Sequence, residues 1–295
     1  MKDNLQKYKN INKKIFLSPI KDQEELGNFL LYMHSMYEYL FNGLVGAPIH
    51  EKLQHGAKVL EFCWDSDLWI TEVAAEYPNT KFYVVDFNIL ASNNDDDNIT
   101  FIKCELFQKL PFPDDEFDYI FCRDKFHFFE KDNFYYYLSD ILRILKPGGW
   151  LEIGYLLKHD INNGPATKLM MDAWQLWLKS HNVVKDFMEN FEKYLQDTGK
   201  VESILHQLVT SPIGGIHDFG EFSRELVICY MKCSKDYLVP FMNISTEVFD
   251  SLVSIAESEM RAKDCDMSFQ LKRIIARKKI PTFKENGNYT YNSLQ

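Results

Sequence analysis

Two side chains combine a reactive group with a position at the end of a predicted strand. Asp86 ends the run VVDF, where a carboxylate can accept two hydrogen bonds from the ribose hydroxyls of a nucleotide. The alternative is a surface carboxylate that caps a turn. His127 stands in RDKFHFFE after another apolar run, and it is either a general base for an oxygen or nitrogen nucleophile or an ordinary loop histidine.

Aromatic side chains and candidate metal ligands occur elsewhere in the sequence. The tyrosine run 135–137 and the pair Trp174 and Trp177 either line an apolar ligand pocket or belong to the core. The acidic run 95–97 is expected to form a solvated turn. Cys229 and Cys233 lie one helical turn apart but have no histidine or third thiol nearby in sequence. We therefore predict no metal site.

The elements that would position these side chains alternate between strands and helices. Such alternation predicts right-handed crossovers and a doubly wound α/β sheet. In this kind of sheet a ligand binds outside the carboxyl ends of the strands, here after residues 62, 86, 105 and 122. The predicted strands are 58–62, 81–87, 99–105, 117–123, 150–157, 200–215 and 268–279, and the segment 200–215 includes a closing turn at Gly214 and Gly215. The predicted helices are 26–44, 66–78, 132–146, 161–198, 219–238 and 246–263.

The domain organisation that we expect is one α/β domain with helical additions. Residues 1–25 are predicted to be a flexible leader, 26–56 an N-terminal helical segment and 281–295 a C-terminal tail. The domain itself spans 57–280, with a core at 57–160 and helical additions on the substrate side at 161–263.

Composition and charge exclude several classes of function. The formal net charge of -10 argues against a nucleic-acid binder or a binder of anionic membranes, because phosphate contacts need a basic face. The basic residues between 272 and 279 are expected to form a solvated strand edge. Apolar runs long enough to span a membrane or to form a signal peptide are absent from the sequence. We therefore expect a cytoplasmic protein with free thiols.

Three segments carry a resemblance to a known family. GAKVLEFCWDSDLWITEVAAEYPNTKFYVVDF, LPFPDDEFDYIFCR and LRILKPGGWLEIGY, in this order and spacing, resemble the class I S-adenosylmethionine-dependent methyltransferases, in particular a fungal subgroup of the secondary-metabolite type. The likeness covers residues 28–280. It implies a Rossmann-like, doubly wound, seven-stranded sheet with an antiparallel last strand, and S-adenosyl-L-methionine as the cofactor.

The resemblance also implies roles for individual residues. Glu61 would lie near the methionine amino group of the cofactor, and Asp86 would bind its ribose. Glu105 and Leu106 would border the adenine. The other residues that it assigns to the cofactor site are Cys63 and Asp65 in the cofactor loop, Trp69, which matches a tryptophan usual in the subgroup, and Arg123 after the fourth strand.

The cofactor loop departs from the family pattern. The family carries GCGxG after the acidic end of the first strand, whereas this chain has Cys63, Trp64, Asp65, Ser66 and Asp67. Side chains at the three glycine positions cost on the order of 1 kcal/mol each where positive φ is required. Asp65 or Asp67 could also cap the following helix and so satisfy the helix end that normally attracts the cofactor carboxylate.

These observations bear on three classes of function. The leading hypothesis is an S-adenosylmethionine-dependent methyltransferase that acts on a small-molecule or otherwise unknown acceptor. The alternative is a catalytically inactive, methyltransferase-like binding or regulatory protein, a pseudoenzyme. A nicotinamide-dependent oxidoreductase is poorly supported because no GxGxxG follows the first strand.

Overall fold

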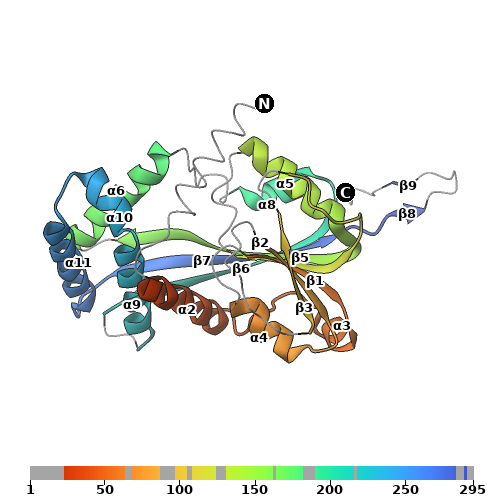
Figure 1. The fold of residues 1–295 in the computed structure, drawn as a ribbon, viewed down its shortest axis with the longest axis horizontal. Coiled ribbons are helices and arrows are strands. Elements are labelled where there is room, and N and C mark those ends of the chain that lie inside the picture. The colour runs from red at the N-terminus through yellow and green to blue at the C-terminus, as the bar shows by residue number, and fades with distance from the viewer. Residues whose placement is uncertain are drawn as a thin grey trace. The chain divides into compact units, whose positions relative to one another are not determined.

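The computed structural model describes residues 23–63, 68–86, 97–104, 108–123, 131–161, 164–181, 190–215, 218–283 and 289–290. Its strands and helices are labelled in Figure 1. The strands are β1 (Lys58–Cys63), β2 (Lys81–Asp86), β3 (Ile99–Lys103), β4 (Phe117–Arg123), β5 (Leu145–Ile161), β6 (Val201–Ile213), β7 (Met267–Lys278), β8 (Thr282–Phe283) and β9 (Tyr289–Thr290). The helices are α2 (Gln23–Leu40), α3 (His50–His55), α4 (Leu68–Glu76), α5 (Lys131–Ile144), α6 (Pro165–Ser180), α8 (Phe191–Asp197), α9 (Asp218–Cys233), α10 (Lys235–Met242) and α11 (Thr246–Arg261).

Seven of the strands form one mixed sheet in the order β3-β2-β1-β4-β5-β7-β6. β1 pairs in parallel with β2 and β4, β2 pairs in parallel with β3, and β4 pairs in parallel with β5. The last strand, β7, is antiparallel. The strand order reverses between β1 and β4, as it does in doubly wound sheets. The predicted Rossmann-like, seven-stranded sheet is therefore confirmed.

The main error of the sequence interpretation lies between residues 145 and 181. β5 begins directly after α5 and continues to Ile161, whereas the sequence predicted a strand at 150–157 and a helix from 161. The next helix, α6, starts at Pro165, which fits the first turn because its fixed φ is helical and its missing N–H would have no intrahelical partner. The segment predicted as one helix at 219–238 is two helices, α9 and α10, with Ser234 between them.

The chain divides into two compact units, each assembled from three segments. Unit 1 comprises Met1–Gly43, Leu156–Val184 and Leu208–Leu271, and unit 2 comprises Leu44–Tyr155, Lys185–Gln207 and Lys272–Gln295. Three of the boundaries fall inside strands β5, β6 and β7. Sequence patterning could not locate such boundaries, because composition does not change in the middle of a strand.

One hydrophobic core cluster of unit 2 lies on the face of the sheet that carries α3 and α4. β4 is buried along almost its whole length, as expected for a central strand covered on both faces. Trp69 of α4 stacks on Phe121 of β4, with ring centroids 4.0 Å apart. Leu53 of α3 and Ile49, the residue before that helix, complete this core. This packing fixes the first four strands, whose carboxyl ends are the predicted ligand site.

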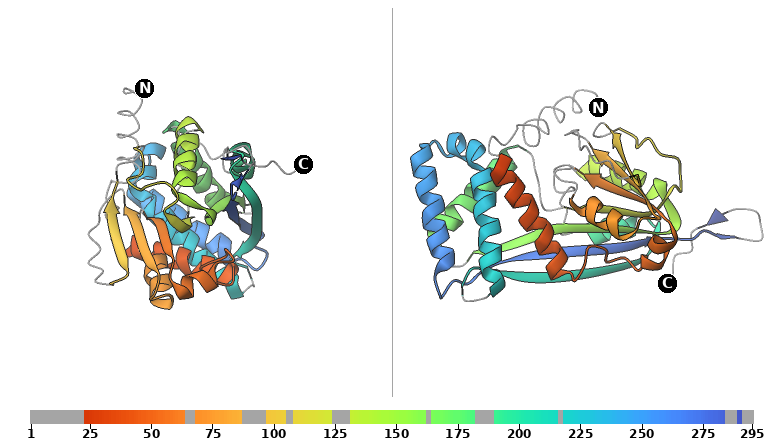
Figure 2. Two further views of the ribbon diagram at one scale, coloured as in Figure 1. Left: turned by 90° about the vertical axis from the view of Figure 1, so that its right-hand side faces the viewer. Right: turned by 60° about the horizontal axis from the view of Figure 1, so that its bottom comes forward.

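Unit 1 is built mainly from helices. α2 lies alongside α9, and α11 packs against α6 and α9 (Figures 1 and 2). The N-terminus of α6 is capped by Glu259 of α11, which accepts hydrogen bonds from the amides of Ala166 and Thr167, each at 2.8 Å. Gly214, with a φ of +74°, lies against the carbonyl of Met260, which a β-carbon at this position would overlap.

Candidate functional site

The carboxyl ends of the first strands meet at one edge of the sheet. Cys63 at the end of β1 pairs with Asp86 at the end of β2. Arg123 ends β4, pairs with Gly154 of β5, and is half-buried. Backbone positions of three predicted cofactor-site residues, Cys63, Asp86 and Arg123, therefore stand at the ends of β1, β2 and β4. This is the edge at which doubly wound sheets bind their ligands.

Glu61 lies two residues before Cys63 in β1, and its side chain is buried. It pairs in register with Phe121, which in turn pairs with Glu152 of β5. Residues that pair in register project from the same face of a sheet, so the two carboxylates lie on the face against which Trp69 packs. The cross-strand row Glu61, Phe121 and Glu152 therefore places two carboxylates in the protein interior, below the carboxyl ends of the strands.

The fully buried Glu152 is the centre of a polar network in unit 2. One carboxylate oxygen accepts hydrogen bonds from the hydroxyl of Tyr119 and from the amides of Gly46 and Ala47, each at 2.9 Å. The other oxygen lies 3.2 Å from Nε of the buried Arg273, as an ion pair without the alignment of a hydrogen bond. Four groups from three parts of the chain thus hold one carboxylate.

Burial dominates the protonation of this network. Desolvation raises the pKa of Glu152, and Arg273, Tyr119 and the two amides offset part of that rise. Burial also raises the pKa of Tyr119 well above its ordinary value, with the negative charge of Glu152 acting in the same direction. The tyrosine therefore stays a hydrogen-bond donor at neutral pH, which keeps its bond to Glu152 intact.

Trp69 and Glu152 both bind the same short segment of backbone. The indole N–H of Trp69 donates to the carbonyl oxygen of Leu44 at 2.8 Å, next to the amides of Gly46 and Ala47. A β-carbon at Gly46 would lie 2.6 Å from the guanidinium of Arg273, so this close approach requires glycine. The contacts of Trp69 that the structure describes are with Leu44, Tyr119 and Phe121. A contact of Trp69 with the cofactor remains a prediction.

Several predicted site residues lie outside the described residues. They are Asp65, Glu105, Leu106 and His127, together with the side chains of Cys63 and Asp86. Their assignments to the cofactor or to a catalytic base therefore remain predictions.

The basic cluster between 272 and 279 was interpreted wrongly as a solvated strand edge. Arg273 and Lys278 are buried. Lys278 donates to Asp115 and to the carbonyl of Leu145, each at 2.6 Å. The sequence signal that was missed is the pairing of charges within apolar strands, Glu152 in WLEIG and Arg273 in KRIIA. Charged residues are rarely buried alone, so each one predicts a partner of opposite charge.

The tryptophan pair belongs to an aromatic cluster of unit 1. Trp174 and Trp177 stack with centroids 5.0 Å apart, and both lie against Tyr237 of α10. Trp177 is buried and Trp174 half-buried. Trp174 also meets Tyr230 of α9 edge to face. These rings hold three helices together, as the core interpretation expected.

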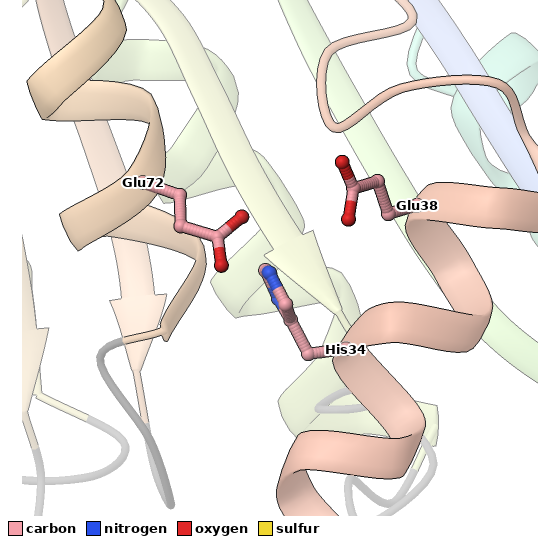
Figure 3. Close-up of side chains that lie close together, drawn as sticks. All are labelled: His34, Glu38 and Glu72. Carbon is pink, nitrogen blue, oxygen red and sulfur yellow. The ribbon is translucent and has the colours of Figure 1, made fainter.

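A histidine and a carboxylate that the sequence analysis did not single out share one face of α2. His34 and Glu38 are one helical turn apart, and their side chains project in the same direction (Figure 3). Glu72, the third side chain in that figure, belongs to α4 of unit 2. Side chains at this i, i+4 spacing are neighbours on any helix, so the pattern carried no signal in the sequence.

Comparisons with known proteins agree with this architecture. Residues 69–153 match the family described as a methyltransferase domain. The chain is 26% identical over 160 residues to the methyltransferase str3 of Strobilurus tenacellus, a match that covers 53% of this chain and 57% of that protein. The strand order and these matches support the resemblance of the chain to the class I S-adenosylmethionine-dependent methyltransferases.

Solved structures show the same fold at low identity. The phosphoethanolamine N-methyltransferase 2 of Haemonchus contortus, solved with phosphomonomethylethanolamine and S-adenosylhomocysteine, has a TM-score of 0.52 and 19% identity over 92% of this chain and 61% of that one. The same enzyme with S-adenosyl-L-methionine has a TM-score of 0.50 and 17% identity, covering 92% and 60%. This chain thus spans less than two thirds of the length of each of these relatives.

Proposed function

We propose that this protein is an S-adenosylmethionine-dependent methyltransferase that acts on a small-molecule acceptor. The observation that carries the proposal is the edge at which β1, β2 and β4 end, with Cys63, Asp86 and Arg123 at their last positions. The sequence match at 69–153 and the strand order support the same activity. Among the described residues, no helix combines the length and the apolar character that a membrane span requires.

The residues at this edge fit the cofactor in chemical type and in spacing. Because Cys63 pairs directly with Asp86, a ligand that lies across the ends of β1 and β2 meets both strand ends at once. A carboxylate at Asp86 suits the ribose hydroxyls, and the acidic Glu61 suits the amino group of the methionine part. Glu105 and Leu106 would border the adenine, and Cys63, Asp65 and Arg123 would complete the site.

The chain's own contribution to the chemistry is positioning. S-adenosylmethionine, when bound, supplies a methyl group on a sulfonium that is already reactive, so placing an acceptor atom beside it provides much of the rate increase. His127 is the candidate base for an acceptor that must lose a proton. Trp69 and Glu152, which fix the backbone at Leu44, Gly46 and Ala47, would keep the floor of the site rigid.

The cellular setting is a further part of the proposal. We propose a cytoplasmic location and a fungal type of methyltransferase, the second of which is supported by the Strobilurus relative. The net charge of -10 supports a small-molecule acceptor over a nucleic acid.

Substitution of the proposed ribose ligand tests the function. Asp86→Asn removes a charged acceptor, and hydrogen bonds to a charged group contribute about 1.5–3 kcal/mol, so affinity for S-adenosylhomocysteine should fall about 10- to 100-fold. The readout is the rise in melting temperature that the ligand produces, which depends on affinity. The matched control is Asp97→Asn, in an exposed turn before β3, which should leave the rise unchanged. Equal shifts for the parent protein and both variants would refute the assignment of Asp86.

A further inference from the structure

A series of hydrogen bonds connects β5 to the first turn of α4. Trp69 is the second residue of α4, and its indole N–H donates to the carbonyl oxygen of Leu44 at 2.8 Å. Two and three residues further along the chain, the amides of Gly46 and Ala47 donate to Glu152 of β5, each at 2.9 Å. We call these contacts the Glu152 strut, and all five residues lie in unit 2.

The sheet holds the Glu152 end of the strut firmly. The carboxylate of Glu152 is fully buried, and it forms an ion pair at 3.2 Å with Nε of Arg273 in β7, which is buried too. The hydroxyl of Tyr119 in β4 donates to the same oxygen as the two amides. Moving Glu152 away from these partners would leave an unpaired charge in the interior, which is strongly unfavourable. Three strands therefore fix the position of Glu152.

The Trp69 end of the strut lies close to the proposed cofactor edge. Four residues of sequence separate Cys63, the last residue of β1, from the first residue of α4. Consecutive Cα atoms are 3.8 Å apart, so α4 begins at most about 19 Å from Cys63. The ring of Trp69 also stacks on Phe121, whose strand ends at the same edge. The strut thus connects the middle of the sheet to the helix that follows the cofactor loop.

We propose that Glu152 is a positioning residue for cofactor binding, which acts through segment 44–47 and Trp69 to hold the first turn of α4 at the cofactor edge. The inference rests on the proposed function. Without the strut, only a fraction of the molecules would hold α4 in the binding conformation, and the apparent affinity for the cofactor would fall by that fraction. Trp69 then serves as a link in the strut rather than as a direct contact of the cofactor.

A double-mutant cycle on cofactor affinity tests the proposal. Trp69→Phe keeps a ring against Phe121 but removes the indole N–H, and Glu152→Gln removes the charge that faces Arg273. Each should weaken the calorimetric binding of S-adenosylhomocysteine about 2- to 10-fold, the equivalent of one hydrogen bond. Because both interrupt the same strut, the double variant should bind no more weakly than the poorer single variant. A direct contact of Trp69 with the cofactor would instead make the two losses multiply.

Hydrogen exchange supplies a readout that needs no cofactor. In the ligand-free protein, Trp69→Phe and Glu152→Gln should each speed the exchange of α4 amides several-fold, because the helix loses its connection to the sheet. Circular dichroism verifies that the variants are folded. Tyr119→Phe, which removes one donor to Glu152, replaces Glu152→Gln in both measurements if that variant does not fold.

The matched control is Asp140→Asn, at another buried carboxylate of unit 2. Asp140 accepts hydrogen bonds from the amide of Leu110 and from Arg143, each at 2.6 Å. Its substitution should destabilise the fold yet leave cofactor affinity and exchange in α4 unchanged. A parent protein that fails to bind S-adenosylhomocysteine would overturn the proposed function and this inference together. Binding by the parent with multiplying losses in the double variant, unchanged exchange in α4, or an equal effect of Asp140→Asn would overturn the inference alone.

Discussion

Individual residues show how charge is used inside the sheet of unit 2. Asp118 of β4 is buried, and three lysine residues from neighbouring elements hold its carboxylate. It accepts a hydrogen bond from the amide of Lys58 and another from the ammonium of Lys146, each at 2.9 Å, and it forms an ion pair with Lys52. These partners lie 28 to 66 positions away along the chain, so sequence spacing gave no sign of the cluster.

The pKa of Asp118 leads to a pH-dependent contribution to stability. Burial alone raises the pKa, but the two lysines and the amide of Lys58 outweigh it, and the net pKa lies below the ordinary value of 3.8. A depressed pKa means that the carboxylate stabilises the folded state above the unfolded pKa and that this is lost as the pH falls through the folded pKa. Asp118→Asn should therefore lower the free energy of unfolding by about 1–2 kcal/mol at pH 7, since both lysines remain partly exposed.

Urea unfolding at a series of pH values measures this effect. The difference between the parent protein and Asp118→Asn should be constant near neutral pH and shrink below about pH 4. The control is Asp172→Asn, which breaks an exposed pair with Lys168 and should cost less than about 0.5 kcal/mol. A difference that does not shrink in acid would show that the charge of Asp118 is not what stabilises the fold.

At the scale of elements, the sequence predicted most strands and helices because their apolar periodicity is strong. Runs such as KVLEF, KFYVVDF and FDYIFCR have the length and composition of buried strands. The extension of β5 to Ile161 was missed because three of its last four residues, KHDI, are polar and the segment shows no apolar alternation. The turn after β6 was recognised from Gly214 and Gly215, although the role of these glycines in packing was not.

Two glycines with similar backbone conformations distinguish the energetic cost of backbone strain from the cost of a steric overlap. Gly199 has a φ of +65° and open space around it, whereas Gly214 has a φ of +74° and would overlap Met260 if it had a β-carbon. Gly199→Ala should cost about 1–2 kcal/mol, the penalty of the left-handed conformation alone. Gly214→Ala should cost clearly more, on the order of 3 kcal/mol or above, because α11 must also move away. Urea unfolding compares the two, and equal losses would mean that the approach of Met260 does not matter.

At the scale of the whole molecule, the architecture was predictable and the site only in part. Alternating strands and helices can close into few topologies, because crossovers between parallel strands are right-handed. The edge formed by Cys63, Asp86 and Arg123 follows from that topology alone. The network around Glu152 was not predictable from the topology. It joins segments around residues 46, 119, 152 and 273, and no sequence periodicity connects them.

The central claim is that this chain binds S-adenosylmethionine although the glycine positions of its cofactor loop hold Cys63, Asp65 and Asp67. Calorimetric titration of the full chain with S-adenosylmethionine measures this directly. We expect binding of one cofactor per chain, weakened by at most a few kcal/mol relative to a glycine loop, which is roughly a hundredfold in affinity. The absence of any heat of binding at millimolar cofactor would contradict the account and leave only the methyltransferase fold.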